Sequence, residues 1–168
     1  MRNPLQRGYT LFDLLVTLAL IALLAAIAAP NLTQLVESNR QHALLGELQR
    51  SLQEARARAI LEGRTIEICA YSTGEQCGED WNKGWILRAS RTKEILSVKQ
   101  STRSEGTLRW SGYSTTIRFR PNGTSPTGNG RFTLCAPQAM AWQLVINRQG
   151  RIRSASNSEN QNEQHRCP

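Results

Sequence analysis

The stretch Gly8-Tyr9-Thr10-Leu11-Phe12-Asp13 opens an almost wholly apolar run that continues from Leu14 to Ala29. From Tyr9 to Ala29 the run has 21 residues, of which Asp13 alone is charged. An α-helix rises about 1.5 Å per residue, so this length spans the roughly 30 Å hydrocarbon core of a bilayer. Residues 9–29 are therefore predicted to form a transmembrane helix that anchors the rest of the chain.

A short basic leader, residues 1–8, precedes this helix and carries Arg2 and Arg7. Basic residues beside a membrane span favour the cytoplasmic side, so the rest of the chain is expected in the periplasm. A cleaved secretory signal is the alternative, because residues 25–29 could serve as a small-residue cleavage site. The apolar run is long for such a signal, and cleavage there would remove a helix whose pattern continues.

The order of residues at the start of the apolar run is specific. Gly8 is followed by aromatic Tyr9, apolar Phe12 and acidic Asp13, and this order resembles the class III signal of type IV prepilins and pseudopilins. The resemblance implies cleavage after Gly8 by a prepilin peptidase at the inner membrane, and N-methylation of Tyr9. It also implies that Asp13, where glutamate is usual, pairs with the terminal amine of a neighbouring pilin subunit, since a charge at membrane depth needs a partner.

A second helical segment is predicted over residues 30–62. Apolar residues recur there at steps of three and four and form one stripe of a helix. We expect a single helix from about Thr10 to Leu61, membrane-embedded in its first half and amphipathic in its second. Arginines off the stripe, such as Arg56 and Arg58, are expected to face solvent. The stripe consists of Leu45, Leu48, Leu52, Ala55 and Ala59.

Residues 63–155 change to a period of two, which is typical of β-strands. The polar segment Ser72–Asp80 and the loop Thr124–Gly130 are expected to be irregular, the second one exposed. The polar tail, residues 156–168, is expected to be disordered unless Cys167 tethers it. The fold class is therefore α+β, a long N-terminal helix packed on an antiparallel β-sheet domain. The expected strands are Thr65–Tyr71, Trp85–Ala89, Glu94–Val98, Thr107–Trp110, Thr116–Arg120, Arg131–Ala136, Ala141–Ile146 and Arg151–Ala155.

Four cysteines, Cys69, Cys77, Cys135 and Cys167, all follow the apolar run. An even number beyond a membrane anchor predicts two disulfides in an oxidising compartment. Of the three possible pairings we favour Cys69–Cys77, which closes a short loop, with Cys135–Cys167, which ties down the tail. Their spacing fits no zinc motif, so neither a metal nor another cofactor is expected.

Three short runs in the second half of the chain resemble the GspH/FimT group of minor pilins and pseudopilins. They are Ile-Arg-Phe-Arg-Pro-Asn-Gly at residues 117–123, Phe-Thr-Leu-Cys at 132–135 and Gly-Arg-Ile-Arg at 150–153. The resemblance implies the type IV pilin fold, and other pilin subunits as partners.

Arginine is concentrated in residues 101–168. This part holds nine arginines, no lysine and three acids, a balance of +6, in a chain of net charge +8. The Gly-Arg-x-Arg run places Arg151 and Arg153 on one face of a predicted strand, with Arg148 across the turn. It resembles the C-terminal motif of FimT proteins, which implies binding of double-stranded DNA during natural transformation. Arg118, Arg120 and Arg131 flank a neighbouring loop and are the further candidates.

Such a site is expected to contact phosphates, because a guanidinium group can donate two parallel hydrogen bonds to phosphate oxygens. Little sequence preference is expected, because phosphate contacts carry no sequence information. Trp110, Tyr113 and Phe119 lie among the arginines but are expected in the core rather than stacked on bases. The structural alternative is that the arginines keep an exposed edge strand soluble, in a minor pilin or GspH-like pseudopilin that primes filament assembly or type II secretion.

Catalysis has almost no support in the sequence. It contains no phosphate-binding glycine loop, and neither histidine lies beside a candidate nucleophile. We therefore expect a protein that is not an enzyme.

Overall fold

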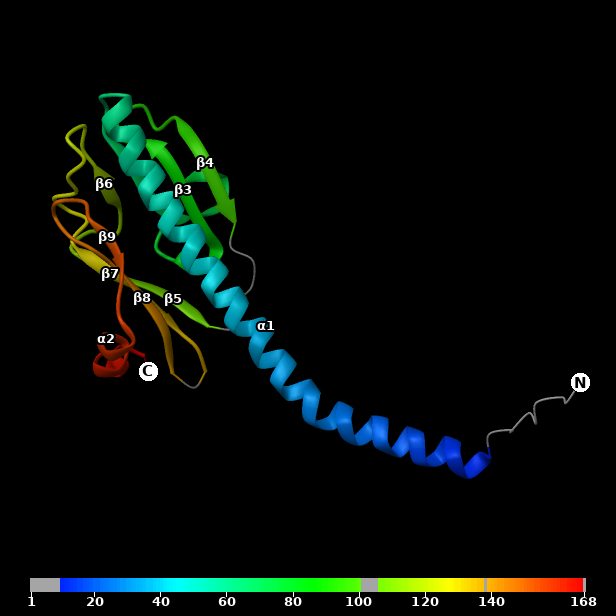
Figure 1. The fold of residues 1–168 in the computed structure, drawn as a ribbon. Coiled ribbons are helices and arrows are strands. Elements are labelled where there is room, and N and C mark those ends of the chain that lie inside the picture. The colour runs from blue at the N-terminus through cyan, green and yellow to red at the C-terminus, as the bar shows by residue number, and fades with distance from the viewer. Residues whose placement is uncertain (1–9, 101–105, 138, 168) are drawn as a thin grey trace, which may run out of the picture. The chain divides into compact units, whose positions relative to one another are not determined.

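The computed structural model describes residues 10–100, 106–137 and 139–167 and divides into two compact units, residues 1–39 and 40–168. Helix α1 (Leu11–Leu61) begins and ends within one residue of the predicted helix. The helix and the strand-rich domain are shown in Figure 1. Gly8 and Tyr9, the expected cleavage and methylation positions, lie outside the described residues.

The N-terminal unit is the apolar part of α1. Its side chains from Leu11 to Ala29 are exposed, and a window of 18 residues reaches a mean hydropathy of 2.6. By length and composition α1 can cross a membrane, although a signal sequence would pass the same test. The exposed apolar surface indicates a membrane anchor.

Asp13 closes the first turn of α1. Its Oδ2 accepts hydrogen bonds from the backbone N and the Oγ1 of Thr10, at 3.0 and 2.8 Å. The backbone N of Asp13 in turn donates to Thr10 Oγ1 at 3.2 Å. This reciprocal pair satisfies donors that the start of a helix leaves without partners, so within one chain Asp13 caps its own helix.

The C-terminal unit contains two antiparallel sheets rather than one. The first has the order β2-β1-β3-β4, with β6 also paired to β1, and the second has the order β5-β7-β8-β9. The first sheet contains β1 (Ile66–Tyr71), β2 (Cys77–Gly78), β3 (Gly84–Ala89), β4 (Ile95–Gln100) and β6 (Ile117–Phe119). The second contains β5 (Thr107–Gly112), β7 (Gly130–Cys135), β8 (Met140–Ile146) and β9 (Ile152–Ser154). Short 3-10 turns are η1 (Thr73–Glu75), η2 (Trp81–Lys83) and η3 (Gln164–Arg166), and a second helix is α2 (Asn157–Asn162).

One core joins the second half of α1 to both sheets. The helix contributes one buried stripe, and Leu44 takes the place that the sequence assigned to the half-buried Leu45. The sheets contribute large aromatic side chains, and Trp142 Nε1 on β8 donates to the carbonyl oxygen of Gln41 at 2.9 Å. The buried stripe is Leu44, Leu48, Leu52, Ala55 and Ala59, and the buried aromatics of the core are Trp81, Trp85, Phe119, Phe132 and Trp142.

Two segments differ from the predicted loops. The segment from Ser72 to Asp80 contains β2, which pairs with β1 through Tyr71 and Cys77. In the loop 124–130, Ser125 is fully buried, although the sequence predicted an exposed loop. Ser125 Oγ donates to Arg118 O of β6 at 2.8 Å, and Ser125 N donates to Arg148 O of the β8–β9 turn at 2.9 Å, so the residue is enclosed by two other segments.

The tail is ordered, as expected for a tail tethered through Cys167, and it forms helix α2, which the sequence analysis did not predict. Ser156 is the N-cap of this helix, and Glu159 completes a capping box with it. The two disulfides join Cys69 to Cys77 and Cys135 to Cys167, the pairing that the sequence favoured. The second one ties the end of the tail to β7.

Candidate nucleic-acid interface

The turn between β8 and β9 carries Arg148 and Arg151. It closes through a hydrogen bond from Gly150 N to Asn147 O at 2.9 Å, and Asn147 Oδ1 accepts from Arg151 N at 2.9 Å. Gly150 has φ +74°, and a Cβ at this position would lie 2.2 Å from Gly123 O. Only glycine fits there without strain, so this residue lets the arginine turn pack directly on the neighbouring loop.

That neighbouring loop, which follows β6, carries Arg120. Gly123 N donates to Arg120 O at 2.8 Å, which forms the turn predicted at Pro121-Asn122-Gly123. The two loops are also joined by a backbone hydrogen bond of 2.9 Å from Ser125 N to Arg148 O. Arg120, Arg148 and Arg151 are exposed, and we call them the loop arginines. In the described part of the chain, no side-chain hydrogen bond or ion pair is recorded for any of the three.

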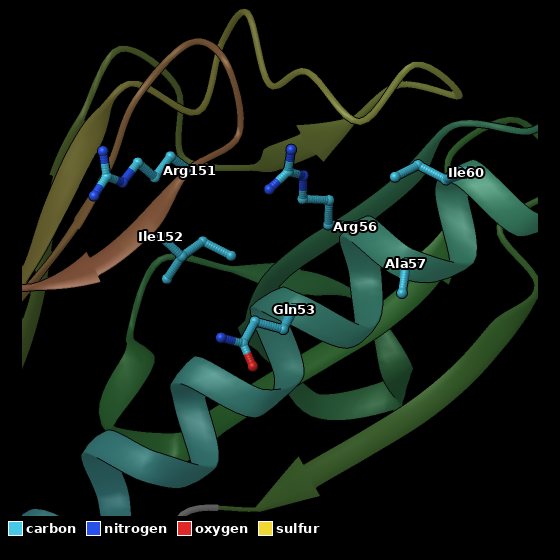
Figure 2. A pocket seen from close by; sticks show the side chains of 6 residues that line it. All are labelled: Gln53, Arg56, Ala57, Ile60, Arg151 and Ile152. Carbon is cyan, nitrogen blue, oxygen red and sulfur yellow. The ribbon is translucent and has the colours of Figure 1, made fainter.

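A pocket of about 310 Å³ lies between α1 and the segment from Arg151 to Ile152, where the turn enters β9. Figure 2 shows the residues that line it, with Arg56 and Ile60 on α1 and with Arg151 and Ile152 on the opposite segment. Arg56 Nε donates to Gly123 O at 3.0 Å, so this arginine is half-buried rather than facing solvent as the sequence predicted. Ile60, four residues after Arg56, could have indicated this position, because it widens the apolar side of the helix next to Arg56.

Arg131 and Arg153 lie on a different part of the domain. Both pair directly with Val145 of β8, which places their side chains on the same face of the second sheet. Each is engaged by an acid of the tail. Arg153 makes two hydrogen bonds of 2.7 Å with the two carboxylate oxygens of Glu159, and Arg131 Nη1 lies 3.4 Å from Glu163 Oε1.

Arg118 is part of an ion cluster around Glu67, whose side chain is 1% exposed. Glu67 accepts hydrogen bonds from Arg88, Lys93, Arg118 and Ser90. Burial alone would raise the pKa of Glu67, but the hydrogen bonds from Lys93, Arg88, Arg118 and Ser90 lower it to about 2. Arg118 therefore contributes to the fold, which the sequence did not indicate.

The six arginines proposed from the sequence thus separate into two groups. Arg120, Arg148 and Arg151 lie exposed on the two loops that are hydrogen-bonded to each other. Arg118, Arg131 and Arg153 each pair with an acid of the same chain.

The aromatic residues near the arginines differ in exposure. Phe119 is fully buried, and Trp110 packs on Phe132 with a centroid distance of 4.6 Å. Tyr113 is 87% exposed, contrary to its predicted place in the core, because it follows β5 in the link to β6.

A second pocket, of about 350 Å³, lies near the Cys135–Cys167 disulfide and includes Arg109. Among the described residues no group of three histidine, cysteine or acidic side chains could hold a metal ion.

Comparison with known proteins identifies the family. Residues 45–150 match the family model described as type II transport protein GspH, which is more than half of the chain. The chain belongs to the GspH family. This confirms the resemblance to the GspH/FimT group seen in the sequence, and the family is one of structural pilins rather than of enzymes. No curated protein sequence matches the chain.

The fold of this family member is that of a solved minor pilin. Two crystal forms of the type IV minor pilin FimU of Pseudomonas aeruginosa match with TM-scores of 0.57 and 0.58, each at 23% identity. The matches cover 70% and 71% of this chain and 94% and 91% of the FimU chains. At this identity the likeness shows the fold, and the fold is the type IV pilin fold expected from the sequence.

Proposed function

We propose that this chain is a minor type IV pilin that binds double-stranded DNA without sequence preference, for DNA uptake in natural transformation. The observation that carries the proposal is the group of loop arginines, exposed and held on two loops that are hydrogen-bonded to each other. Guanidinium groups bind phosphate through two parallel hydrogen bonds. Three of them on rigid loops give a compact surface for a DNA backbone.

The arrangement favours contacts to phosphates over contacts to bases. Arg56 and Arg151 border the pocket, and of the aromatic residues Trp110, Tyr113 and Phe119, which lie among the arginines in sequence, only Tyr113 is exposed. Phosphate contacts carry no sequence information of their own. Duplex DNA of any sequence is therefore the ligand class that we propose.

In this proposal the N-terminal part of the chain anchors the arginine domain at the membrane and later carries it into a filament. A prepilin peptidase cleaves after Gly8 and Tyr9 becomes methylated, while residues 9–29 hold the subunit in the inner membrane with the arginine domain in the periplasm. On entry into a filament, Asp13 pairs with the terminal amine of a neighbouring pilin subunit instead of capping only its own helix.

The test is a titration of the full chain in uncharged detergent with a fluorescent duplex. We expect tight binding at low salt, and a marked loss when Arg120, Arg148 and Arg151 are all changed to glutamine. The slope of log K against log salt should become less negative by about 0.9 for each lost phosphate contact. The matched control changes three exposed cations elsewhere, Arg50, Lys83 and Arg91, to glutamine.

The control variant removes the same total charge, so it separates a local site from a general attraction. Equal losses in the two triple variants would refute a site at the loop arginines. If the unchanged protein fails to bind the duplex at low salt, the proposed function is wrong.

A second candidate function is structural, and the match to the GspH family model favours it. A minor pilin or GspH-like pseudopilin would prime filament assembly or type II secretion by packing against other subunits. Deletion of the gene separates the two functions. Loss of pili or of secretion indicates the structural role, whereas intact pili with reduced transformation indicate DNA uptake.

A further inference from the structure

The tail is fixed to the outer face of the second sheet by contacts along its length. Cys167 is bonded to Cys135 of β7. Gln164 Oε1 accepts from Met140 N at 2.9 Å, and the buried Asn160 accepts through Oδ1 from Gln143 Nε2 at 3.3 Å. Helix α2 lies beside β8 in Figure 1. The tail therefore has a defined place, although its sequence is polar throughout.

This position brings two carboxylates onto two arginines. Both carboxylate oxygens of Glu159 accept hydrogen bonds from the guanidinium group of Arg153. Glu163 forms ion pairs with Arg131 and Arg166. The hydrogen bonds from Arg153 and from the backbone of Ser156 lower the pKa of Glu159 to about 2, so it is ionised at neutral pH.

A carboxylate that accepts two parallel hydrogen bonds from a guanidinium group makes the same contact that a phosphate would make. Arg131 and Arg153 flank Val145 on one sheet face, and Arg153 is two residues from Arg151, one of the loop arginines. With the two glutamates displaced, these arginines would extend the proposed DNA surface from the loops onto the sheet.

We propose that the tail, residues 156–167, is a built-in competitor of DNA. Its Glu159 and Glu163 hold Arg153 and Arg131 in place of two backbone phosphates, and a bound duplex displaces them. This inference rests on the proposed DNA-binding function. It adds a regulation to that site, because the acids of the tail set the affinity and the number of phosphate contacts.

Displacement of the carboxylates is feasible because the pairs are solvent-accessible. The side chains of Arg153 and Glu159 are both 43% exposed, those of Arg131 and Glu163 are 29% and 27% exposed, and surface ion pairs are individually weak. A duplex already held by the loop arginines presents its phosphates at high effective concentration. The tail therefore weakens binding without preventing it.

The test is Glu159→Gln combined with Glu163→Gln in the full chain. Glutamine at the third position of a helix also completes a capping box with serine, so α2 can keep its first turn while both charges are removed. The matched control is Glu54→Gln with Glu94→Gln. These two acids pair with Arg58 and Arg64, away from the second sheet, and Glu62 stays paired with both arginines. The control therefore makes the same change in net charge without freeing an arginine.

The readout is duplex affinity over a range of salt concentrations. We expect the tail variant to bind several-fold more tightly than the unchanged protein. Its slope of log K against log salt should become more negative by about 0.9 for each arginine that gains a phosphate. The control variant should show a smaller gain in affinity and little change in slope.

Each outcome has a distinct meaning. Tighter binding with a steeper slope in the tail variant alone supports the competition. If the unchanged protein binds and the tail variant matches it or matches the control, the tail is not a competitor and the DNA function stands. If the unchanged protein does not bind the duplex at low salt, the proposed function fails and the inference fails with it.

Discussion

Glu67 is the only charged residue that is buried among the described residues of the domain. Its carboxylate lies in the first sheet and is surrounded by Arg88, Lys93 and Arg118. An ionised carboxylate is tolerated in such a place only when hydrogen-bonding cations compensate for its lost hydration. Two segments distant in sequence, the β3–β4 hairpin and β6, thus converge on one side chain.

Glu67→Gln should lower the free energy of unfolding by about 2 kcal/mol. Breaking a fully buried pair typically costs ~3–5 kcal/mol, but Lys93 and Arg118 are 53% and 47% exposed and can turn to water. Urea denaturation at pH 7 measures the loss. Glu54→Gln is the control, because its pair with Arg58 is exposed and such pairs contribute less than about 1 kcal/mol. Equal losses in the two variants would contradict a special role for Glu67.

The contribution of Glu67 should also depend on pH. Its pKa in the folded domain is about 2, below its ordinary value of 4.5. A lowered pKa stabilises the fold fully above pH 4.5, and this stabilisation is lost as the pH falls towards 2. The difference in stability between the unchanged protein and Glu67→Gln should therefore shrink between pH 6 and pH 2.5. A difference that stays constant over this range in urea titrations would rule out this ionisation as its source.

Gly150 determines how the two arginine loops pack. Gly150→Ala should destabilise the domain and weaken DNA binding, because φ is +74° and the new Cβ would meet Gly123 O at 2.2 Å. The control is Gly46→Ala within α1, where a Cβ would have no atom within 4 Å. That change should stabilise the helix by about 0.5–1 kcal/mol. Thermal unfolding of both variants checks the opposite signs.

At the scale of elements, periodicity was sufficient to locate α1 and most strands. Steps of three and four residues gave the buried side of the helix, and alternation gave the strands from Ile66 onwards. Helix α2 was missed because a polar segment of six residues has no apolar period. A signal for it was present, since Ser156 and Glu159 have the spacing of a capping box. Burial of Ser125 depends on partners in other loops, which no local pattern reveals.

The two disulfides should differ in their effect on stability. The Cys135–Cys167 bond closes a separation of 32 residues and the Cys69–Cys77 bond one of 8. By loop entropy, removing the first should cost about 3.7 kcal/mol and removing the second about 2.5 kcal/mol. Because Cys167 ends the tail, Cys135→Ser with Cys167→Ser should also speed hydrogen exchange in α2. Unchanged exchange there would mean that Gln164 and Asn160 suffice to hold the tail.

At the scale of the whole molecule, the sequence located the arginines but not their partners. Arg153 lies six residues from its acid, whereas Arg118 lies 51 residues from Glu67. The Arg118–Glu67 pair depends on the register of the first sheet, and the Arg153–Glu159 pair depends on where the tail packs. Neither can be deduced from the composition. The loop arginines, by contrast, follow from turn signals at Gly123 and Gly150. The sequence therefore predicted the loops of the candidate site better than its sheet face.

The distribution of the core predicts that the second unit folds without the membrane segment. Every core residue lies between Leu44 and Ile152, within residues 40–168. A fragment from Thr33 to the end should be soluble and unfold cooperatively on heating, as followed by circular dichroism. The control fragment begins at Gln53 and lacks three leucines of the buried stripe. Each buried leucine contributes about 1.5–3 kcal/mol, a sum comparable to the net stability of about 5–15 kcal/mol of a whole domain. The shorter fragment should therefore show no cooperative transition, and a cooperative one would mean that the two sheets form a stable core without that part of α1.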